Sequence, residues 1–165
     1  VELGYVLRSP VTRQLRSVAD LKTYISQVVP VVEIPDLNYT NVGGLNANDI
    51  IATNVSASHH VVGKPFVLPD LGAVNDITMA FYRDDQQIDS GRARDAMGDQ
   101  LEALLWLVND VQARGWPLLA GQLFITGTLG KMQPAVPGAY RVDYGLGRAL
   151  SFTFKPAAAA QAQPK

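Results

Sequence analysis

Two strand-like apolar runs in this chain each carry a carboxylate. Residues 1–7 contain Glu2, and residues 31–35 contain Glu33. A carboxylate in an apolar interior is unfavourable unless it is paired or binds a cation, and clusters of oxygen ligands suit Mg²⁺, Mn²⁺ or Ca²⁺ better than zinc. The pattern therefore indicates a cation site on two strands. For Glu33 alone, a salt bridge or a strand edge facing water is an alternative that spacing slightly favours.

The composition excludes several classes of protein. The chain has 165 residues, of which 47% are apolar and 18% charged, and its net charge of -1 offers no basic stripe for a nucleic acid. No apolar stretch approaches the roughly 18 residues of a membrane span. The absence of cysteine excludes disulfides, thiolate zinc sites and a cysteine nucleophile.

Periodicity predicts two helices among many strands. The first would begin after Ser17 and stop before Pro30, with its apolar residues on one face. The second would run from about Asp99 to Arg114, with Gly115 at the left-handed cap position. Strands are expected at 3–8, 31–35, 59–67, 77–82, 87–90, 123–126, 140–144 and 149–154.

No repeat or linker divides the chain, and strands and helices do not alternate regularly. The order predicts a mixed α/β, β-dominated domain over residues 1–155. Residues 156–165, rich in Ala, Gln and Pro, are expected to form a disordered tail. Asp49, after an Asn- and Gly-rich loop, is expected to cap a short helical turn.

Several familiar motifs are incomplete. His59 and His60 are neighbours on an expected strand, so they would point to opposite faces, one inward and one outward, and could not easily chelate one ion. The nearby serines lack a nucleophile-elbow sequence. Residues 127–131 lack the spacing of a phosphate loop, and residues 145–147 lack the third glycine of a dinucleotide fingerprint. Both segments are predicted to be turns.

An ordered set of segments carries a family resemblance. It comprises Glu2 in residues 2–7, Glu33 in residues 32–36, the run Asp-Ile-Ile-Ala-Thr-Asn-Val-Ser at 49–56, and segments 91–98, 105–107, 115–118 and 121–127. Over essentially the whole chain these resemble the fumarylacetoacetate hydrolase superfamily, and within it the branch of 2-keto-4-pentenoate hydratases and 4-oxalocrotonate decarboxylases. The separation of Glu2 and Glu33 matches that of the family.

The resemblance implies the family's β-sheet roll with a few flanking helices. It also implies Mg²⁺ or Mn²⁺ held by three carboxylates, with Glu2 as the second ligand and Glu33 as the third. The first would lie two residues before Glu2, outside this sequence. The chain is therefore expected to be the C-terminal portion of a longer protein, or to work with a separate N-terminal segment or partner enzyme. In the family, the N-terminal region supplies a catalytic lysine and acidic groups.

Other matching positions take roles from the same resemblance. Ser56, Asn54 and Thr126 would contact the substrate, whereas Asp36 and Asp49 would orient the loop or support the metal ligands. The implied substrate is a small 2-oxo acid. The implied reaction is hydration of 2-hydroxypenta-2,4-dienoate to 4-hydroxy-2-oxopentanoate in aromatic-compound catabolism. Decarboxylation of a 4-oxalocrotonate and hydrolysis of an acylpyruvate are alternatives.

Four positions depart from the family pattern. Leu37, Asn38 and Thr53 do so near the expected site, and Gln100 replaces a usual proline. These departures motivate a hypothesis of another class, a non-catalytic homologue that acts as a scaffold or partner subunit. A homo-oligomer in the cytoplasm is expected, with export to the periplasm as the alternative location.

Overall fold

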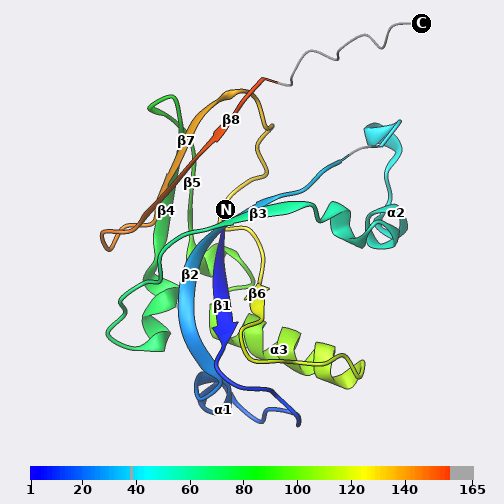
Figure 1. Ribbon diagram of the computed structural model, residues 1–165, viewed down its shortest axis with the longest axis vertical. Coiled ribbons are helices and arrows are strands. Elements are labelled where there is room, and N and C mark those ends of the chain that lie inside the picture. Colours follow the sequence, from blue (N-terminus) through cyan, green and yellow to red (C-terminus); the bar gives the residue numbers. More distant parts are fainter. Residues whose placement is uncertain (38, 157–165) are drawn as a thin grey trace, which may run out of the picture.

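The strands form two four-stranded antiparallel sheets in the computed structural model, which describes residues 1–37 and 39–156 (Figure 1). The strand order is β3-β2-β1-β6 in the first sheet and β5-β4-β7-β8 in the second. The β-dominated α/β class is therefore confirmed. The strands are β1 (Glu2–Leu7), β2 (Ile25–Ile34), β3 (His59–Val62), β4 (Thr78–Arg83), β5 (Gln86–Arg92), β6 (Leu123–Ile125), β7 (Gly138–Asp143) and β8 (Ala149–Phe154).

The helices are few and mostly short. The predicted tail from residue 157 onward, like Asn38, lies outside the described residues. The α-helices are α1 (Val18–Lys22), α2 (Ala47–Ala52) and α3 (Gln100–Ala113), and the 3₁₀ turns are η1 (Val42–Gly44), η2 (Asn54–Ser56), η3 (Leu71–Asp76) and η4 (Ala93–Asp95). No helix among the described residues is long and apolar enough to cross a membrane.

Helix α3 confirms the clearest prediction from the sequence. The Asp99 side chain accepts hydrogen bonds from the amides of Leu101 and Glu102, and so caps free donors of the first turn. At the other end, Gly115 has a φ of 75°, which suits glycine far better than other residues. The buried face includes Leu104 and Val108, which join the main core.

The predicted helix from Ser17 to Pro30 is wrong beyond its first turns. Ser17 does cap α1, but the helix ends at Lys22 and Ile25 begins strand β2. The run of β-branched residues that follows pairs with β1, and this pairing overrides the helical spacing. Pro30 fits in the strand because its carbonyl points towards β3, where it accepts from Gly63, so its missing N–H costs no bond to β1.

Two hairpin turns were predicted correctly. Asp84 and Asp85 join β4 to β5, with φ values of 48° and 65°. Residues 145–147 join β7 to β8, and all three have positive φ. The strand expected at 59–67 ends earlier, at Val62. The helical turn near Asp49 begins earlier than expected, because Asn46 is the N-cap of α2.

The two sheets share one hydrophobic core. Tyr144, just after β7, donates its hydroxyl to the carbonyls of Glu2 at 3.2 Å and Val31 at 2.8 Å, and so ties the second sheet to the first. Burial raises the pKa of the Tyr144 hydroxyl, which keeps it a donor. In the second sheet, four aromatic rings pack together: Phe81, Tyr140, Phe152 and Phe154.

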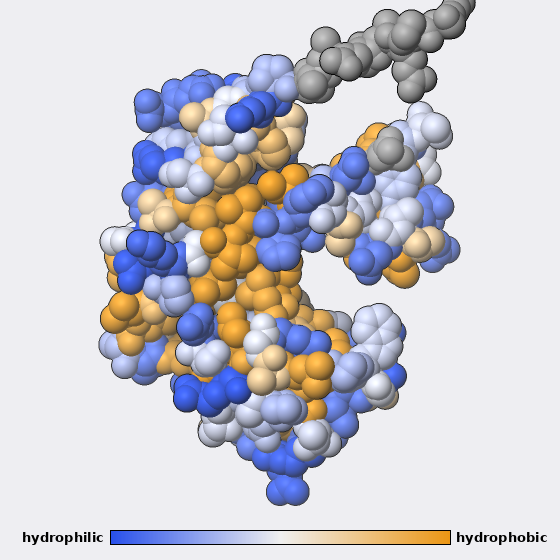
Figure 2. Space-filling model, in the orientation of Figure 1, coloured by the Kyte–Doolittle hydropathy of each residue, from blue (hydrophilic) through white to orange (hydrophobic). Residues whose placement is uncertain are grey.

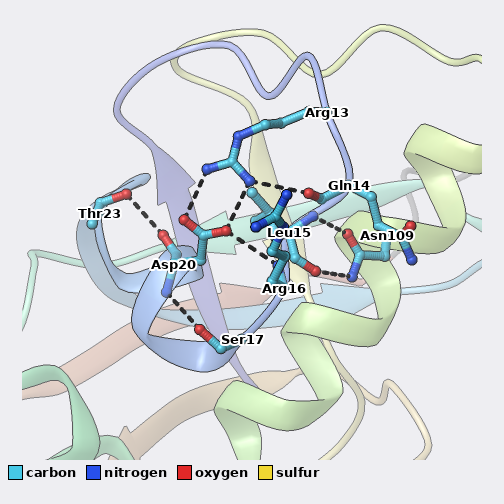
Figure 3. A network of polar contacts seen from close by, with 8 residues as sticks. All are labelled: Arg13, Gln14, Leu15, Arg16, Ser17, Asp20, Thr23 and Asn109. Atoms are coloured by element: carbon cyan, nitrogen blue, oxygen red, sulfur yellow. Dashed lines mark hydrogen bonds and ion pairs between the residues drawn. The ribbon is translucent and has the colours of Figure 1, made fainter.

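A polar network fixes the loop between β1 and α1 (Figure 3). Asp20 accepts two hydrogen bonds from the Arg13 guanidinium, at 2.8 and 2.9 Å, and one from the Arg16 amide at 3.2 Å. Asn109 of α3 pairs with both backbone groups of Leu15. A cavity of about 1040 Å³ lies beside this loop, at the opposite end of β1 from Glu2. Since Arg13 and Asp20 neutralise one another, we do not place the site there.

Residues 39–58 project from the sheets as an arm that ends in α2 (Figure 1). Several apolar side chains on it are exposed, among them Val42, Ile51 and Val55. Figure 2 shows a hollow between this arm and the part of the molecule that carries α3, with a band of apolar surface beside it. The arm carries several of the residues that the sequence assigned to the site.

Candidate metal and substrate site

The two strand glutamates lie on neighbouring strands. Glu2 is on β1 directly opposite Val31 of β2, and Glu33 follows two residues later on the same face of β2. The Glu2 side chain is buried, with only 6% of the residue exposed, and Glu33 is half-buried. The fold therefore brings together two acidic groups that are separated in the sequence by the rest of β1, by α1 and by most of β2.

The electrostatics of this pair are unfavourable without a cation. Burial raises the pKa of the Glu2 carboxyl above its usual range, and the negative charge of Glu33 raises it further. The amide of Gly127 opposes this shift, because it donates a hydrogen bond of 2.8 Å to the Glu2 carboxylate. None of the ion pairs among the described residues involves either glutamate.

A hard divalent cation fits these donors, because a buried carboxylate beside a second one is stabilised by a shared positive charge. The part that this chain supplies is limited. In residues 1–37 and 39–156, no group of three or more acidic, histidine or cysteine side chains is placed to hold an ion. His59 and His60 are both exposed on β3, so the expectation that one would point inward is wrong.

Thr126 directly follows β6 and precedes Gly127, which contacts the acid pair formed by Glu2 and Glu33. Its hydroxyl donates to the side-chain oxygen of Gln100 at 2.8 Å, and the next residue, Gly127, provides the amide that binds Glu2. From the sequence, Gly127 belongs to a predicted turn and to one of the segments that carry the family resemblance. Its role as a donor to Glu2 could not be found from spacing, because the two residues lie 125 positions apart.

Asp36 and Ser56 meet at the base of the arm. The Asp36 amide donates to the Ser56 carbonyl at 2.9 Å, so Ser56 lies just beyond the end of β2 that carries Glu33. The Ser56 side chain is buried and its hydroxyl lies 2.9 Å from that of Tyr39. Tyr39 also bonds to the hydroxyl of Thr53. Three hydroxyls are therefore gathered here, and sequence reasoning missed Tyr39.

The other two arm residues have different settings. Asn54 is exposed and starts a run of three residues in the left-handed region, with φ values of 54°, 57° and 55° through Ser56. Such a conformation is unfavourable for Val55, which is β-branched. The Asp49 carboxylate accepts from the Asn46 amide at 3.0 Å and completes a capping box of α2. Asp49 therefore stabilises the first turn of α2.

Sequence comparison finds relatives that are named as hydratases. The chain is 31% identical over 146 residues to 2-keto-4-pentenoate hydratase 1 of Dechloromonas aromatica (strain RCB), which covers 88% of this chain and 54% of that protein. The chain thus spans about half the length of the curated relatives it matches. No protein-family model matches the sequence.

Solved structures with the same fold include two metal complexes. The 4-oxalocrotonate decarboxylase of Pseudomonas putida G7, complexed with magnesium and adipate, superposes with a TM-score of 0.80 and 22% identity, over 91% of this chain and 57% of that one. The maleylpyruvate hydrolase of Sphingobium sp. SYK-6, in complex with manganese(II) and pyruvate, gives a TM-score of 0.65 and 14% identity, over 92% and 52%. At these identities the likeness concerns the fold.

Proposed function

Because this chain belongs with the 2-keto-4-pentenoate hydratases and has the fold of the fumarylacetoacetate hydrolase superfamily, we propose that it forms part of a divalent-metal-dependent lyase site. The substrate would be a 2-oxo or 2-hydroxydienoate acid, and the reaction hydration of 2-hydroxypenta-2,4-dienoate to 4-hydroxy-2-oxopentanoate. The main support for this proposal is the buried Glu2 carboxylate beside Glu33. A cation would stabilise these two neighbouring negative charges.

Glu2 and Glu33 would hold Mg²⁺ or Mn²⁺. When bound, such a cation would supply positive charge near the carboxylate and adjacent oxygen of a 2-oxo acid, which would favour enolate character in the substrate. The Gly127 amide keeps the Glu2 side chain in one orientation. Both Mg²⁺ and Mn²⁺ accept oxygen ligands of this kind.

Ser56 and Asn54 would recognise the substrate carboxylate by donating hydrogen bonds. The Tyr39 hydroxyl fixes that of Ser56, which lies at the end of the strand carrying Glu33. Thr126 would provide a further contact with the substrate, next to the Gly127 amide. Asp36 and Asp49 would hold the arm in position, through the backbone contact with Ser56 and the cap of α2 respectively.

The proposal also covers the domain, the assembly and the location of the protein. We place residues 1–155 in one catalytic domain and expect a cytoplasmic homo-oligomer. The exposed apolar side chains of the arm, such as Ile51 and Val55, support association with another surface. Light scattering on the purified protein measures the mass of the assembly, and a monomer would contradict the oligomer.

The activity is tested by supplying 2-hydroxypenta-2,4-dienoate and Mg²⁺ to the protein that contains this chain. Hydration gives 4-hydroxy-2-oxopentanoate as the only product. With 4-oxalocrotonate, release of CO₂ would instead identify a decarboxylase, and with an acylpyruvate, formation of two acids would identify a hydrolase. If none of these substrates is consumed and no metal binds, the protein is a non-catalytic homologue.

A further inference from the structure

Gln100 is completely buried, which is uncommon for a glutamine. Its side-chain oxygen accepts from the Tyr5 hydroxyl at 2.9 Å and from the Thr126 hydroxyl at 2.8 Å. Its side-chain nitrogen donates to the carbonyl of Ala93 at 2.6 Å, and its backbone amide donates to Asn75 at 2.9 Å. Gln100 therefore joins β1, the start of α3 and the end of β6.

Thr126, which bonds to Gln100, is joined by one peptide bond to the residue that contacts Glu2. Gly127, the next residue, donates its amide to the Glu2 carboxylate. A shift of Thr126 would turn this amide away from Glu2, because the two residues share a rigid peptide plane. Gln100 can thus affect the hydrogen bond between Gly127 and Glu2 without contacting either glutamate.

The far end of the same segment is held independently. The Lys131 amide donates to the Asp89 carboxylate at 2.7 Å, and the Leu129 amide donates to the Val1 carbonyl at 2.9 Å. A side chain at Gly91 would come within 1.5 Å of the Leu129 carbonyl oxygen, so this part of the segment packs directly against β5. At the Thr126 end, the segment is bonded to the side chain of Gln100.

We propose that Gln100 is a positioning residue, which aligns the Thr126–Gly127 peptide so that the Gly127 amide faces Glu2. Its relevance to metal binding rests on the proposed function, but the alignment itself does not. A proline at this first position of a helix would be compatible with α3. It would supply neither the amide that binds Asn75 nor the side chain that binds Thr126. The glutamine therefore provides a connection that the usual proline cannot.

Amide hydrogen exchange of metal-free protein tests this alignment at Gly127. The Gln100→Met and Thr126→Val variants should each speed exchange at Gly127 by about tenfold relative to reference amides in β4 and β7, as expected for loss of one hydrogen bond. The double variant should add little to either single one. Gln100→Glu keeps the accepting oxygen and should restore most of the protection.

Tyr5→Phe is the matched control, because it removes the other hydroxyl on the same Gln100 oxygen while leaving Thr126 bound. It should leave Gly127 exchange unchanged. Unchanged exchange in Gln100→Met, or equal acceleration in Tyr5→Phe, would overturn the proposal. If Gln100→Met does not fold, Thr126→Val alone decides, because Thr126 is only half-buried. The measurement uses no metal, so a failure to bind Mn²⁺ would count against the proposed function alone.

Discussion

The amide of Gly127 donates a hydrogen bond of 2.8 Å to the carboxylate of Glu2, which lies 125 residues away in the sequence. The bond joins the turn after β6 to the start of β1. A single neutral donor does not offset burial and the neighbouring charge of Glu33, because the pKa of Glu2 remains raised. A cation shared by the two carboxylates would remove this imbalance.

Replacing the buried hydroxyl at the base of the arm should weaken substrate binding. Ser56→Ala is expected to raise KM about tenfold, because the variant lacks one hydrogen bond to the substrate carboxylate. The affinity for Mn²⁺ should not change, since Ser56 is not a proposed ligand. Steady-state kinetics check this, with the exposed Ser58→Ala as the control. A KM equal to that of the wild type would remove Ser56 from the substrate site.

Removing the cap of α3 should lower stability. Asp99→Ala is expected to reduce the free energy of unfolding by about 1 kcal/mol, because the amides of Leu101 and Glu102 lose their acceptor. Asp99→Ser keeps an N-cap oxygen and should lose less. Urea denaturation measures both values. Equal stability of Asp99→Ala and the wild type would mean that the cap contributes nothing.

The Arg13–Asp20 pair should make stability depend on pH in the acid range. Hydrogen bonds from Arg13 and then from the Arg16 amide lower the pKa of Asp20 to about 2, from an ordinary value of 3.8. Between these values the unfolded chain binds more protons, so stability rises with pH. The contribution is present above the ordinary value and is lost as pH falls through the folded pKa.

Asp20→Asn should therefore lose less stability than the wild type when the pH falls from about 5 to about 2. Urea denaturation at several pH values measures this difference. Asp85→Asn is the control, because Asp85 is exposed in a hairpin turn that asparagine tolerates. A loss as large in Asp20→Asn as in the wild type would contradict the assignment.

Local signals in the sequence predicted those elements whose cause is local. Asp99 and Gly115 mark the ends of α3 because a cap depends on neighbouring residues. The turn at Asp84 and Asp85 depends equally on residues that tolerate positive φ. Strand β2 was predicted only in its second half, because its first half at Ile25 gains its stability from pairing with β1, which no local pattern reveals.

The candidate site likewise contains residues that local sequence predicted and residues that only the fold reveals. Strand-like surroundings pointed to Glu2 and Glu33, and the structure places them on adjacent strands. The partners that orient the site lie far away in sequence or leave no pattern: the Gly127 amide, the Tyr39 hydroxyl and the Gln100 side chain. Hydrogen bonds to backbone amides and between distant side chains depend on the finished fold, so composition and spacing do not predict them.

The central claim, that Glu2 and Glu33 share a divalent cation, is tested most directly by calorimetric titration of Mn²⁺ into this chain. We expect saturable binding to the wild type and to the control Glu102→Gln, whose side chain is exposed on α3. In Glu2→Gln and Glu33→Gln the affinity should fall at least about tenfold, since each loses a charged ligand. Absence of binding to the wild type, or an affinity in both glutamine variants equal to that of the wild type, would contradict the account.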